Sequence, residues 1–445
     1  MSSRRQFLTL SGLAGLSAVA AACGRAPKLE WLLGRATPPQ PRPDRAPFGP
    51  RERFAERVLN RAAYGPRPGD VERVASMGTD AFLEEQLSPA SIPDLQTHFL
   101  VRRVETVHLS APDVFDVAGK TALTDLRRAT LLRAVSSERQ LLERMVEFWS
   151  DHFNVFAGKA DCAWLKVVDD REVIRRHALG SFRDLLLASA TSPAMLVYLD
   201  GRANVAGKPN ENYAREILEL HTLGVDGGYT QRDVMELARA LTGWQVRTFF
   251  ERGRTVFVSK VHDALAKEVL GLRLESGAKA DLERIADRLA AHPSTAGFLA
   301  RKLCRSFIAD EPPDTLVKSV AAAFTRSRGD IRFTLAALLH SEELRTAPPK
   351  FKRPYAFAVS ALRHSGARTD GGRGLQRQIE EMGQLPFAWP TPDGYPEGEE
   401  HWSARMLPRW NFALALAGNA IPGTRVAANP EGLALELCRP EFQYC

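Results

Sequence analysis

The sequence lacks the short motifs that would assign a chemistry directly. Its five cysteines include no C-x-x-C pair and no zinc-ribbon spacing, which argues against a metal held by cysteines. It also has no G-x-S-x-G, no H-E-x-x-H and no phosphate-binding loop. The sequence therefore gives no support for assigning the chain to the usual serine hydrolases, zinc proteases or nucleotide-binding proteins. Any active site has to be sought in other arrangements of polar side chains.

The sequence has no concentration of charge of one sign either. There are 60 Lys and Arg against 53 Asp and Glu, and the formal net charge is +7. The basic residues are interspersed with acidic ones, whereas a nucleic-acid-binding surface gathers them on one face. We therefore expect no nucleic-acid partner. The length, with 44% hydrophobic and 25% charged residues, suits one large globular domain or two smaller ones.

No apolar run at the N-terminus is long enough to span a membrane. Leu8 to Ala22 is short and rich in small residues, and it follows SRRQFL, which resembles a twin-arginine export signal. A general secretory signal is the alternative. AAAC, ending at Cys23, resembles a lipoprotein cleavage site, with ordinary signal-peptidase cleavage as the alternative. We expect a signal peptide over residues 1–23, a lipid anchor on Cys23 and a periplasmic location, the outer membrane being favoured by Gly24.

The rest of the chain divides into a tether and a helical region. Residues 24–50 are rich in Pro and Arg, which is typical of an extended linker. From residue 51 to 445, apolar residues recur at three- and four-residue spacing and predict helices. Only residues 246–260 alternate like a small β-hairpin. We predict a mostly α-helical single large domain. Because export permits disulfides, we also predict one between Cys438 and Cys445.

A polar run at residues 210–224, NENYAREILELHTLG, predicts a short helix with Asn210 as its N-cap and Gly224 as its end. Helical geometry divides it into an apolar side that carries His221 and a polar side that carries Asn212, Arg215, Glu216 and Glu219. The polar side is either a solvated face with weak ion pairs or an active site. In the second case the two glutamates would act as acid and base or share a divalent cation, and the arginine would orient an anion.

Two histidines and one loop add further candidates. His152 lies on the inward-facing stripe of LLERMVEFWSDHF, as a core histidine or as a buried base or ligand. His292 precedes Pro293, so it is a helix cap or part of an anion site at a helix N-terminus. The Pro- and Gly-rich loop MGQLPFAWPTPDGYP supplies aromatic side chains that either stack on sugar rings or plug the domain surface. The candidate substrate-binding residues are Asn212, His292, Trp389, Asp393 and Tyr395.

These segments together resemble a known family. FWSDHFNVF, PNENYAREILELHTLGVDGGYTQRDVMELARALTGW, HPSTAGFLARKL and MGQLPFAWPTPDGYP are similar in order and spacing to the bacterial "domain of unknown function 1800" family, from about residue 55 to 442. The resemblance implies an exported, largely helical protein of unsettled activity. It also implies a partner similar to an exported alkaline-phosphatase-like family, "domain of unknown function 1501". Ser150 stands where relatives often carry His, which puts a two-histidine metal site on that helix in doubt.

The resemblance favours the active-site interpretation of the polar run, because the family motif matches there. Two functions then compete. The first is a hydrolase- or lyase-like enzyme acting on an envelope or extracellular polymer, and it requires an open cleft. The second is a non-catalytic lipoprotein scaffold or binding partner, in which Arg215 and Glu216 are buried and paired. The catalytic residues of the first are His152, Arg215, Glu216 and Glu219, with a divalent metal as a conceivable cofactor.

Overall fold

The computed structural model describes residues 50–275, 279–427 and 430–445. The predicted signal peptide, Cys23 and the tether up to residue 49 lie outside these residues. Within the described ranges no helix is long and apolar enough to cross a membrane. The described residues belong to one compact unit.

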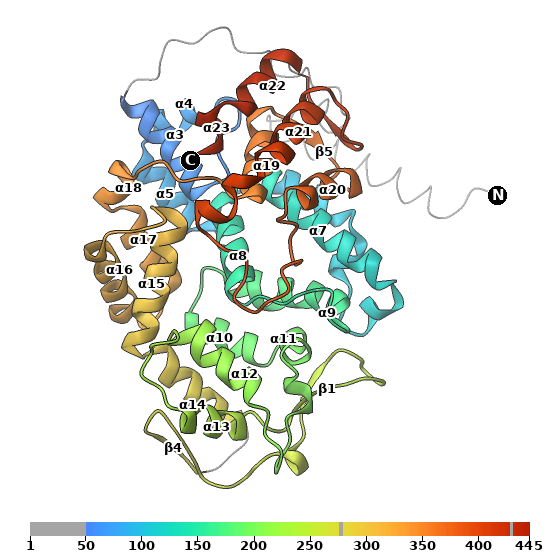
Figure 1. The fold of residues 1–445 in the computed structure, drawn as a ribbon, viewed down its shortest axis with the longest axis vertical. Helices are drawn as coiled ribbons and strands as arrows, with labels where there is room; N and C mark the ends of the chain where they lie inside the picture. Colours follow the sequence, from blue (N-terminus) through green and yellow to red (C-terminus); the bar gives the residue numbers. More distant parts are fainter. Residues whose placement is uncertain (1–49, 276–278, 428–429) are drawn as a thin grey trace, which may run out of the picture. The chain divides into compact units, whose positions relative to one another are not determined.

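The predicted mostly α-helical fold is confirmed (Figure 1). The first half contains α3 (Pro50–Ala62), α4 (Asp70–Met77), α5 (Thr79–Leu87), α6 (Leu95–Arg102), α7 (Gly119–Ser136), α8 (Gln140–His152), α9 (Cys162–Asp169), α10 (Phe182–Ala190), α11 (Pro193–Tyr198), α12 (Glu211–Glu216) and α13 (Gln231–Ala240). The second half contains α14 (Lys279–Ala290), α15 (Pro293–Phe307), α16 (Asp314–Arg326), α17 (Ile331–Leu339), α18 (Glu342–Thr346), α19 (Pro354–His364), α20 (Arg373–Glu381), α21 (Met406–Ala417), α22 (Pro430–Cys438) and α23 (Pro440–Gln443). Two segments, η4 (Asp170–Arg175) and η6 (Ile217–Thr222), are π-helical.

Strands are few and short. The hairpin predicted near residues 246–260 is present as β1 (Trp244–Val246) paired antiparallel with β2 (Thr255–Phe257). Two further antiparallel pairs were not predicted: β3 (Lys267–Val269) with β4 (Leu272–Leu274), and β5 (Arg368–Thr369) with β6 (Thr424–Arg425). Strands of two or three residues are too short to show the alternation by which a strand is predicted.

Helix starts follow local capping chemistry. The side chain of Asn210 accepts a hydrogen bond from the backbone N–H of Asn212 at the start of α12. Thr230 and Asp233 form a capping box on α13. The ring of His292 caps α15 by accepting from the N–H of Ser294 at 3.2 Å. His292 is thus a helix cap, the first of its two predicted roles.

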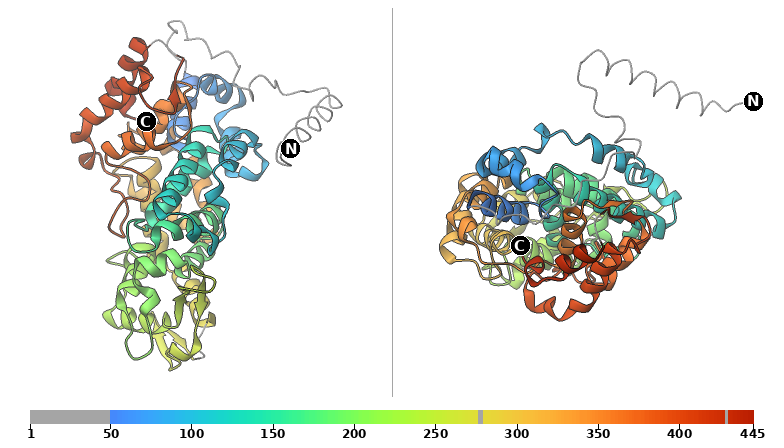
Figure 2. Two further views of the ribbon diagram at one scale, coloured as in Figure 1. Left: turned by 90° about the vertical axis from the view of Figure 1, so that its right-hand side faces the viewer. Right: turned by 90° about the horizontal axis from the view of Figure 1, so that it is seen from above.

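Helix α8 lies in the interior of the helical array (Figures 1 and 2) and contacts α3, α5, α7 and η4. Its apolar stripe, including Leu141, Met145 and Trp149, is almost fully buried in the largest hydrophobic core. In Figure 1 the segment between α20 and α21 runs down to the region of α8 and α9. A helix this central can place polar side chains only where partners from other elements meet them.

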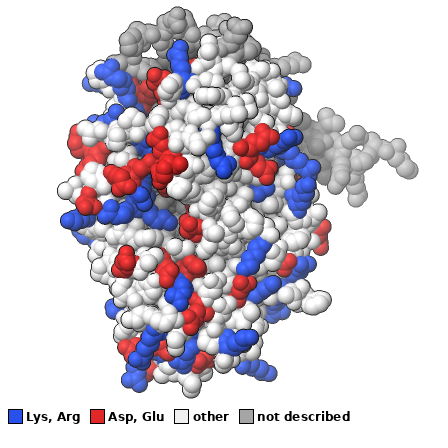
Figure 3. All heavy atoms as spheres, in the orientation of Figure 1, with Lys and Arg blue, Asp and Glu red and all other residues white. Residues whose placement is uncertain are grey.

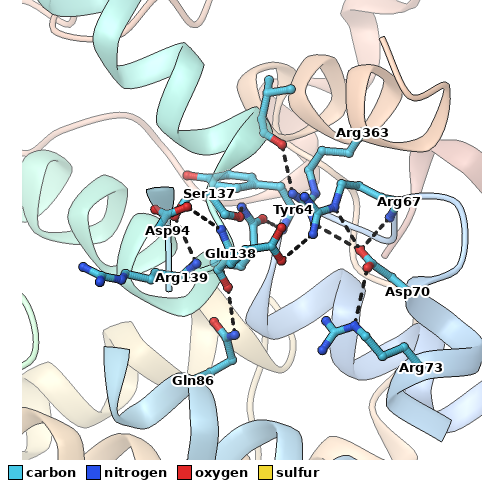
Figure 4. A network of polar contacts seen from close by, with 12 residues as sticks. Tyr64, Arg67, Asp70, Arg73, Gln86, Asp94, Ser137, Glu138, Arg139 and Arg363 are labelled. Atoms are coloured by element: carbon cyan, nitrogen blue, oxygen red, sulfur yellow. Dashed lines mark hydrogen bonds and ion pairs between the residues drawn. The ribbon is translucent and has the colours of Figure 1, made fainter. Parts of the chain in front are cut away.

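A polar network fastens the N-terminal helices to the start of α8 (Figure 4). Arg67 binds Glu138 at 2.6 Å, and Asp70 accepts hydrogen bonds from both Arg67 and Arg363. Gln86 donates to the carbonyl of Glu138 and accepts from the N–H of Leu141. The beginning of α8 is thereby held against α5 and α19, so its side chains project from a fixed frame.

The C-terminal disulfide predicted between Cys438 and Cys445 is not formed, because both thiols are free. Cys438 ends α22 and packs against a second hydrophobic cluster. Cys445 instead exchanges backbone hydrogen bonds with Lys350, and its thiol also faces that carbonyl. The tail is therefore held by a short β-bridge, between Phe351 and Tyr444, and needs no covalent link.

Candidate functional site

Three acidic residues lie on one face of α8. Glu143, Glu147 and Asp151 are spaced four residues apart, which places them one above another on a helix; we call them the α8 carboxylate row. Glu143 is 6% exposed, and the side chains of Glu147 and Asp151 are 11% and 21% exposed. Burying three like charges in a row is unfavourable unless cations from elsewhere compensate them.

The compensating cations come mainly from distant parts of the chain. Arg175, at the end of η4, binds both carboxylate oxygens of Glu143 at 2.9 Å. Arg353, the residue before α19, binds Asp151 at 2.8 Å and Glu147 at 2.5 Å. Such charge-assisted bonds are about twice as strong as neutral ones. The row is therefore held by residues that no local sequence pattern connects to it.

The carboxyl of Asp151 has a perturbed pKa. Burial raises its pKa to about 6, and the negative charges of Glu147 and Glu397 add to the rise while Arg353 opposes it. A carboxyl with a pKa near 6 exchanges its proton within the range in which enzymes work. Perturbed carboxyls of this kind gather at functional sites, although structural ion-pair networks also produce them.

A cavity of about 40 Å³ lies against the row. It has room for a few water molecules. Among the described residues, the buried hydroxyl oxygens of Ser150 and Tyr355 have no hydrogen-bond partner, and both residues line the cavity. A polar ligand or water in the cavity would satisfy groups of this kind. The lining also includes apolar residues such as Val146 and Phe387, and the polar residues Tyr64, Glu143, Glu147, Asp151, Asn154, Arg175 and Tyr395.

The loop between α20 and α21 closes one side of this cavity. Asn154 donates to the carbonyls of Trp389 and Thr391, at 3.1 and 2.7 Å. Gly394 has a φ of +78°, and a Cβ there would lie 2.2 Å from the carbonyl oxygen of Asp151. The loop backbone thus packs directly on α8, at a position that only glycine can occupy without a clash.

The aromatic side chains of this loop pack more than they project. Tyr395 is buried beside Trp389 and Trp402, with ring centroids 5.0 and 6.1 Å away. Trp389 is only half-buried, and its indole N–H donates to the exposed Asp393 at 3.2 Å. The packing interpretation therefore holds for Tyr395, which also lines the cavity, and Trp389 keeps part of its surface in solvent.

Both π-helical segments supply partners to α8. The first, η4, carries Arg175, and the second, η6, places the carbonyl of His221 3.0 Å from Nε2 of His152. A π turn shifts the register of a helix by one residue and is often found at functional sites. Here each segment brings one group onto α8.

His152 is buried, as the inward stripe predicts, but it is not among the residues that line the cavity. Because a carbonyl can only accept, Nε2 carries the proton, and Nδ1 accepts from Lys302 at 3.1 Å. Burial, then the charges of Lys302 and His221, lower the pKa of His152 well below its usual value. It is a neutral core histidine with both ring nitrogens hydrogen-bonded, which favours a structural role.

The polar side of α12 is only partly buried. Arg215 lies between Glu211 and Glu219, at 3.4 and 3.5 Å, and 39% of its side chain is exposed. We call these three residues the α12 charged row. Burial, then Glu219, raises the pKa of Glu216, whereas Asn212 is exposed and reaches the carbonyl of Leu199 at 3.4 Å. The predicted residues therefore form neither an open cleft with His152 nor a buried pair.

A metal centre has no preformed ligand set here. Within residues 50–275, 279–427 and 430–445, no group of three or more His, Cys, Asp or Glu side chains is placed to hold a metal ion. The α8 carboxylate row is instead occupied by arginines and by the hydroxyl of Tyr64, which donates to Glu147 at 2.7 Å.

The sequence contained one signal for the row. The pattern E-x-x-x-E-x-x-x-D in ERMVEFWSD places three acids on one face of a strongly amphipathic helix. Repulsion among them has to be offset by cations, and a row of this kind is therefore a candidate functional site.

No curated protein and no solved structure matches the chain. A family model described as "Protein of unknown function (DUF1800)" matches residues 57–442, and the chain therefore belongs to this family.

Proposed function

We propose that this protein is a hydrolase- or lyase-like enzyme that acts by acid–base catalysis at the α8 cavity. The observation that carries the proposal is Asp151, a carboxyl with a pKa of about 6 beside a cavity onto which two unpartnered hydroxyls open. Its proton would pass to the leaving group; in hydrolysis a water in the cavity would supply the incoming hydroxyl and return its remaining proton to the Asp151 carboxylate. Asp151 thus replaces His152 as the proton-transferring residue.

The substrate class that we propose is a polymer of the bacterial envelope or of the extracellular space. The cavity has room for a few waters and not for a sugar ring, so the polymer would lie at its mouth, beside the half-buried Trp389. The export signal and the lipid anchor on Cys23 belong to the same proposal, since they would bring the enzyme to that substrate. So does an alkaline-phosphatase-like partner.

The test is product release from purified envelope polymers and extracellular polysaccharide by the wild-type protein, Asp151→Asn and Glu219→Gln. Loss of a general acid typically lowers the rate by about 10²–10⁴. We expect that loss for Asp151→Asn and a rate within twofold of wild type for Glu219→Gln, a partly buried acid outside the cavity. The wild-type rate should also fall as the pH rises through about 6, since the acid form of Asp151 is then lost.

A second candidate, a non-catalytic scaffold, rests on the saturation of the polar network. Arg353 binds Glu147, Asp151 and Glu397 together, and such an ion-pair network can hold helices together without any catalytic role. No product release from either folded protein would favour this candidate, whereas equal release by wild type and Asp151→Asn would mean that another group carries the catalysis. Retention of a partner by both proteins in a co-purification would then identify the scaffold's role.

A further inference from the structure

The loop that joins β1 to β2 exposes two neighbouring phenylalanines. Phe249 is 91% exposed and Phe250 is 80% exposed. They are the two most exposed large hydrophobic residues among those described. Single exposed apolar side chains are common, but a pair of aromatic rings at the tip of a projection indicates a binding surface. In Figure 1 the loop next to β1 extends away from the helices.

The second half of this loop and the start of β2 are packed against neighbouring elements. The guanidinium of Arg252 lies 4.0 Å from the centroid of the Phe115 ring and binds Asp161 at 3.2 Å. Gly253 has a φ of +80°, and a Cβ there would lie 2.6 Å from the Phe115 ring. Thr255 donates to the carbonyl of Thr191 at 2.8 Å. These contacts fix the segment that directly follows the two phenylalanines.

The charges around the tip are mainly positive. Arg247 and Arg254 are 43% and 54% exposed, and they share one acid, Glu251. With Arg252 the loop carries three arginines and one glutamate. Figure 3 shows an uncharged projection at the right-hand edge of the lower half, with Lys and Arg beside it. Aromatic rings at a tip with arginines behind them match a lipid surface, where rings enter the acyl boundary and arginines reach phosphates.

We propose that the β1–β2 loop is a membrane contact that inserts Phe249 and Phe250 into the interface of an anionic lipid bilayer. The excess of arginine selects an anionic over a zwitterionic surface, since each basic residue near such a surface adds to binding. This contact is independent of acylation at Cys23 and of the proposed enzymatic activity. It would set which side of the described part of the molecule faces the bilayer.

The experiment is vesicle sedimentation with the full chain carrying Cys23→Ser in every variant, so that no acyl chain contributes. Vesicles of phosphatidylglycerol and phosphatidylethanolamine are compared with phosphatidylcholine vesicles. We expect Phe249→Ser/Phe250→Ser to weaken binding to the anionic vesicles at least tenfold. The matched control, Leu265→Ser/Leu435→Ser, removes two other exposed apolar side chains, 72% and 68% exposed, and should bind like the parent.

A direct reading of insertion comes from Phe249→Trp. Its emission should shift to the blue on anionic vesicles and stay unchanged on phosphatidylcholine. Binding that is equal in the serine variant and the parent would overturn the proposal. So would an unshifted tryptophan, and that result would indicate a protein partner for the loop. Charge is tested by Arg247→Gln/Arg254→Gln, which should lower binding to anionic vesicles and weaken its dependence on salt.

Discussion

Two rows of charged residues in this protein share one spacing and differ in the sign of their charges and in burial. The α8 carboxylate row (Glu143, Glu147, Asp151) and the α12 charged row (Glu211, Arg215, Glu219) both step four residues at a time. The second alternates in sign, so the helix neutralises itself and its side chains stay partly in solvent. The first has one sign only, and it is buried. Arg144 of α8 itself pairs with Glu147, and the other counter-charges, Arg175 and Arg353, come from other elements.

The difference shows how a surface pattern can be told from a site. A row that carries its own counter-charges can form wherever a helix meets water, and its ion pairs contribute little. A buried row of one sign can exist only if the rest of the fold is arranged around it. The conspicuous polar run at residues 210–224 is mostly of the first kind, and the inconspicuous acids of α8 are of the second.

The largest effect is expected from removing the shared cation of the α8 row. Arg353→Met leaves the carboxylates of Glu147 and Asp151 buried without their main partner, and loss of one member of a buried ion pair costs about 3–5 kcal/mol. The matched change in the α12 row, Arg215→Met, should cost about 0–1 kcal/mol. Urea denaturation of both variants measures the difference. Equal losses would mean that the two rows are not distinct in kind.

The pH dependence of stability should come next in size. The pKa of Asp151 is about 6 in the folded protein against 3.8 in the reference state, so the folded state holds a proton more tightly. The stabilisation that protonated Asp151 contributes is fully present below pH 4 and is lost as the pH rises through 6. The free energy of unfolding of Asp151→Asn should therefore rise relative to that of wild type over this window, by up to about 3 kcal/mol at pH 8.

Denaturation curves at pH 4, 5, 6 and 8 measure this change, and they stand independently of any assay of activity. A difference between Asp151→Asn and wild type that stays constant from pH 4 to 8 would contradict it. A more stable variant that has also lost product release would be the expected signature of a residue kept for function at the expense of stability.

The contact between the loop and α8 can be tested with a methyl group. Gly394→Ala would place a Cβ 2.2 Å from the carbonyl of Asp151, whereas Gly228→Ala, also at positive φ, meets nothing within 4 Å. Both variants carry the strain of the backbone conformation, but only the first forces the loop away. We expect Gly394→Ala to lose about 1–3 kcal/mol more than Gly228→Ala. Similar melting of the two variants would argue against close packing of loop and helix.

The smallest effect is expected in the α12 row itself. Glu219→Gln keeps the shape of the side chain and removes one charge from a half-exposed pair, so thermal denaturation should show a change below about 1 kcal/mol. A larger loss would indicate that Tyr229, which donates to Glu219 at 2.7 Å, makes this residue structurally important.

The sequence predicts what depends on neighbours in the chain. The helical content, the caps at Asn210 and Thr230 and the burial of His152 all follow from spacing within a few residues. The partners of Glu143 and Asp151 do not, because Arg175 and Arg353 lie 32 and 202 positions away. The free thiol of Cys438 was not predicted for the same reason, because the tail is held by backbone pairing with a distant segment.

The double hydrogen bond from Asn154 to the loop spans more than 230 positions of the chain. A ribosome makes about 5–20 residues per second, so α8 leaves the ribosome many seconds before Arg353 and the loop exist. During that interval Glu147 and Asp151 lack Arg353, whereas Glu143 can already pair with Arg175. The cavity is thus assembled last, and a chain truncated before residue 395 would contain α8 without the site.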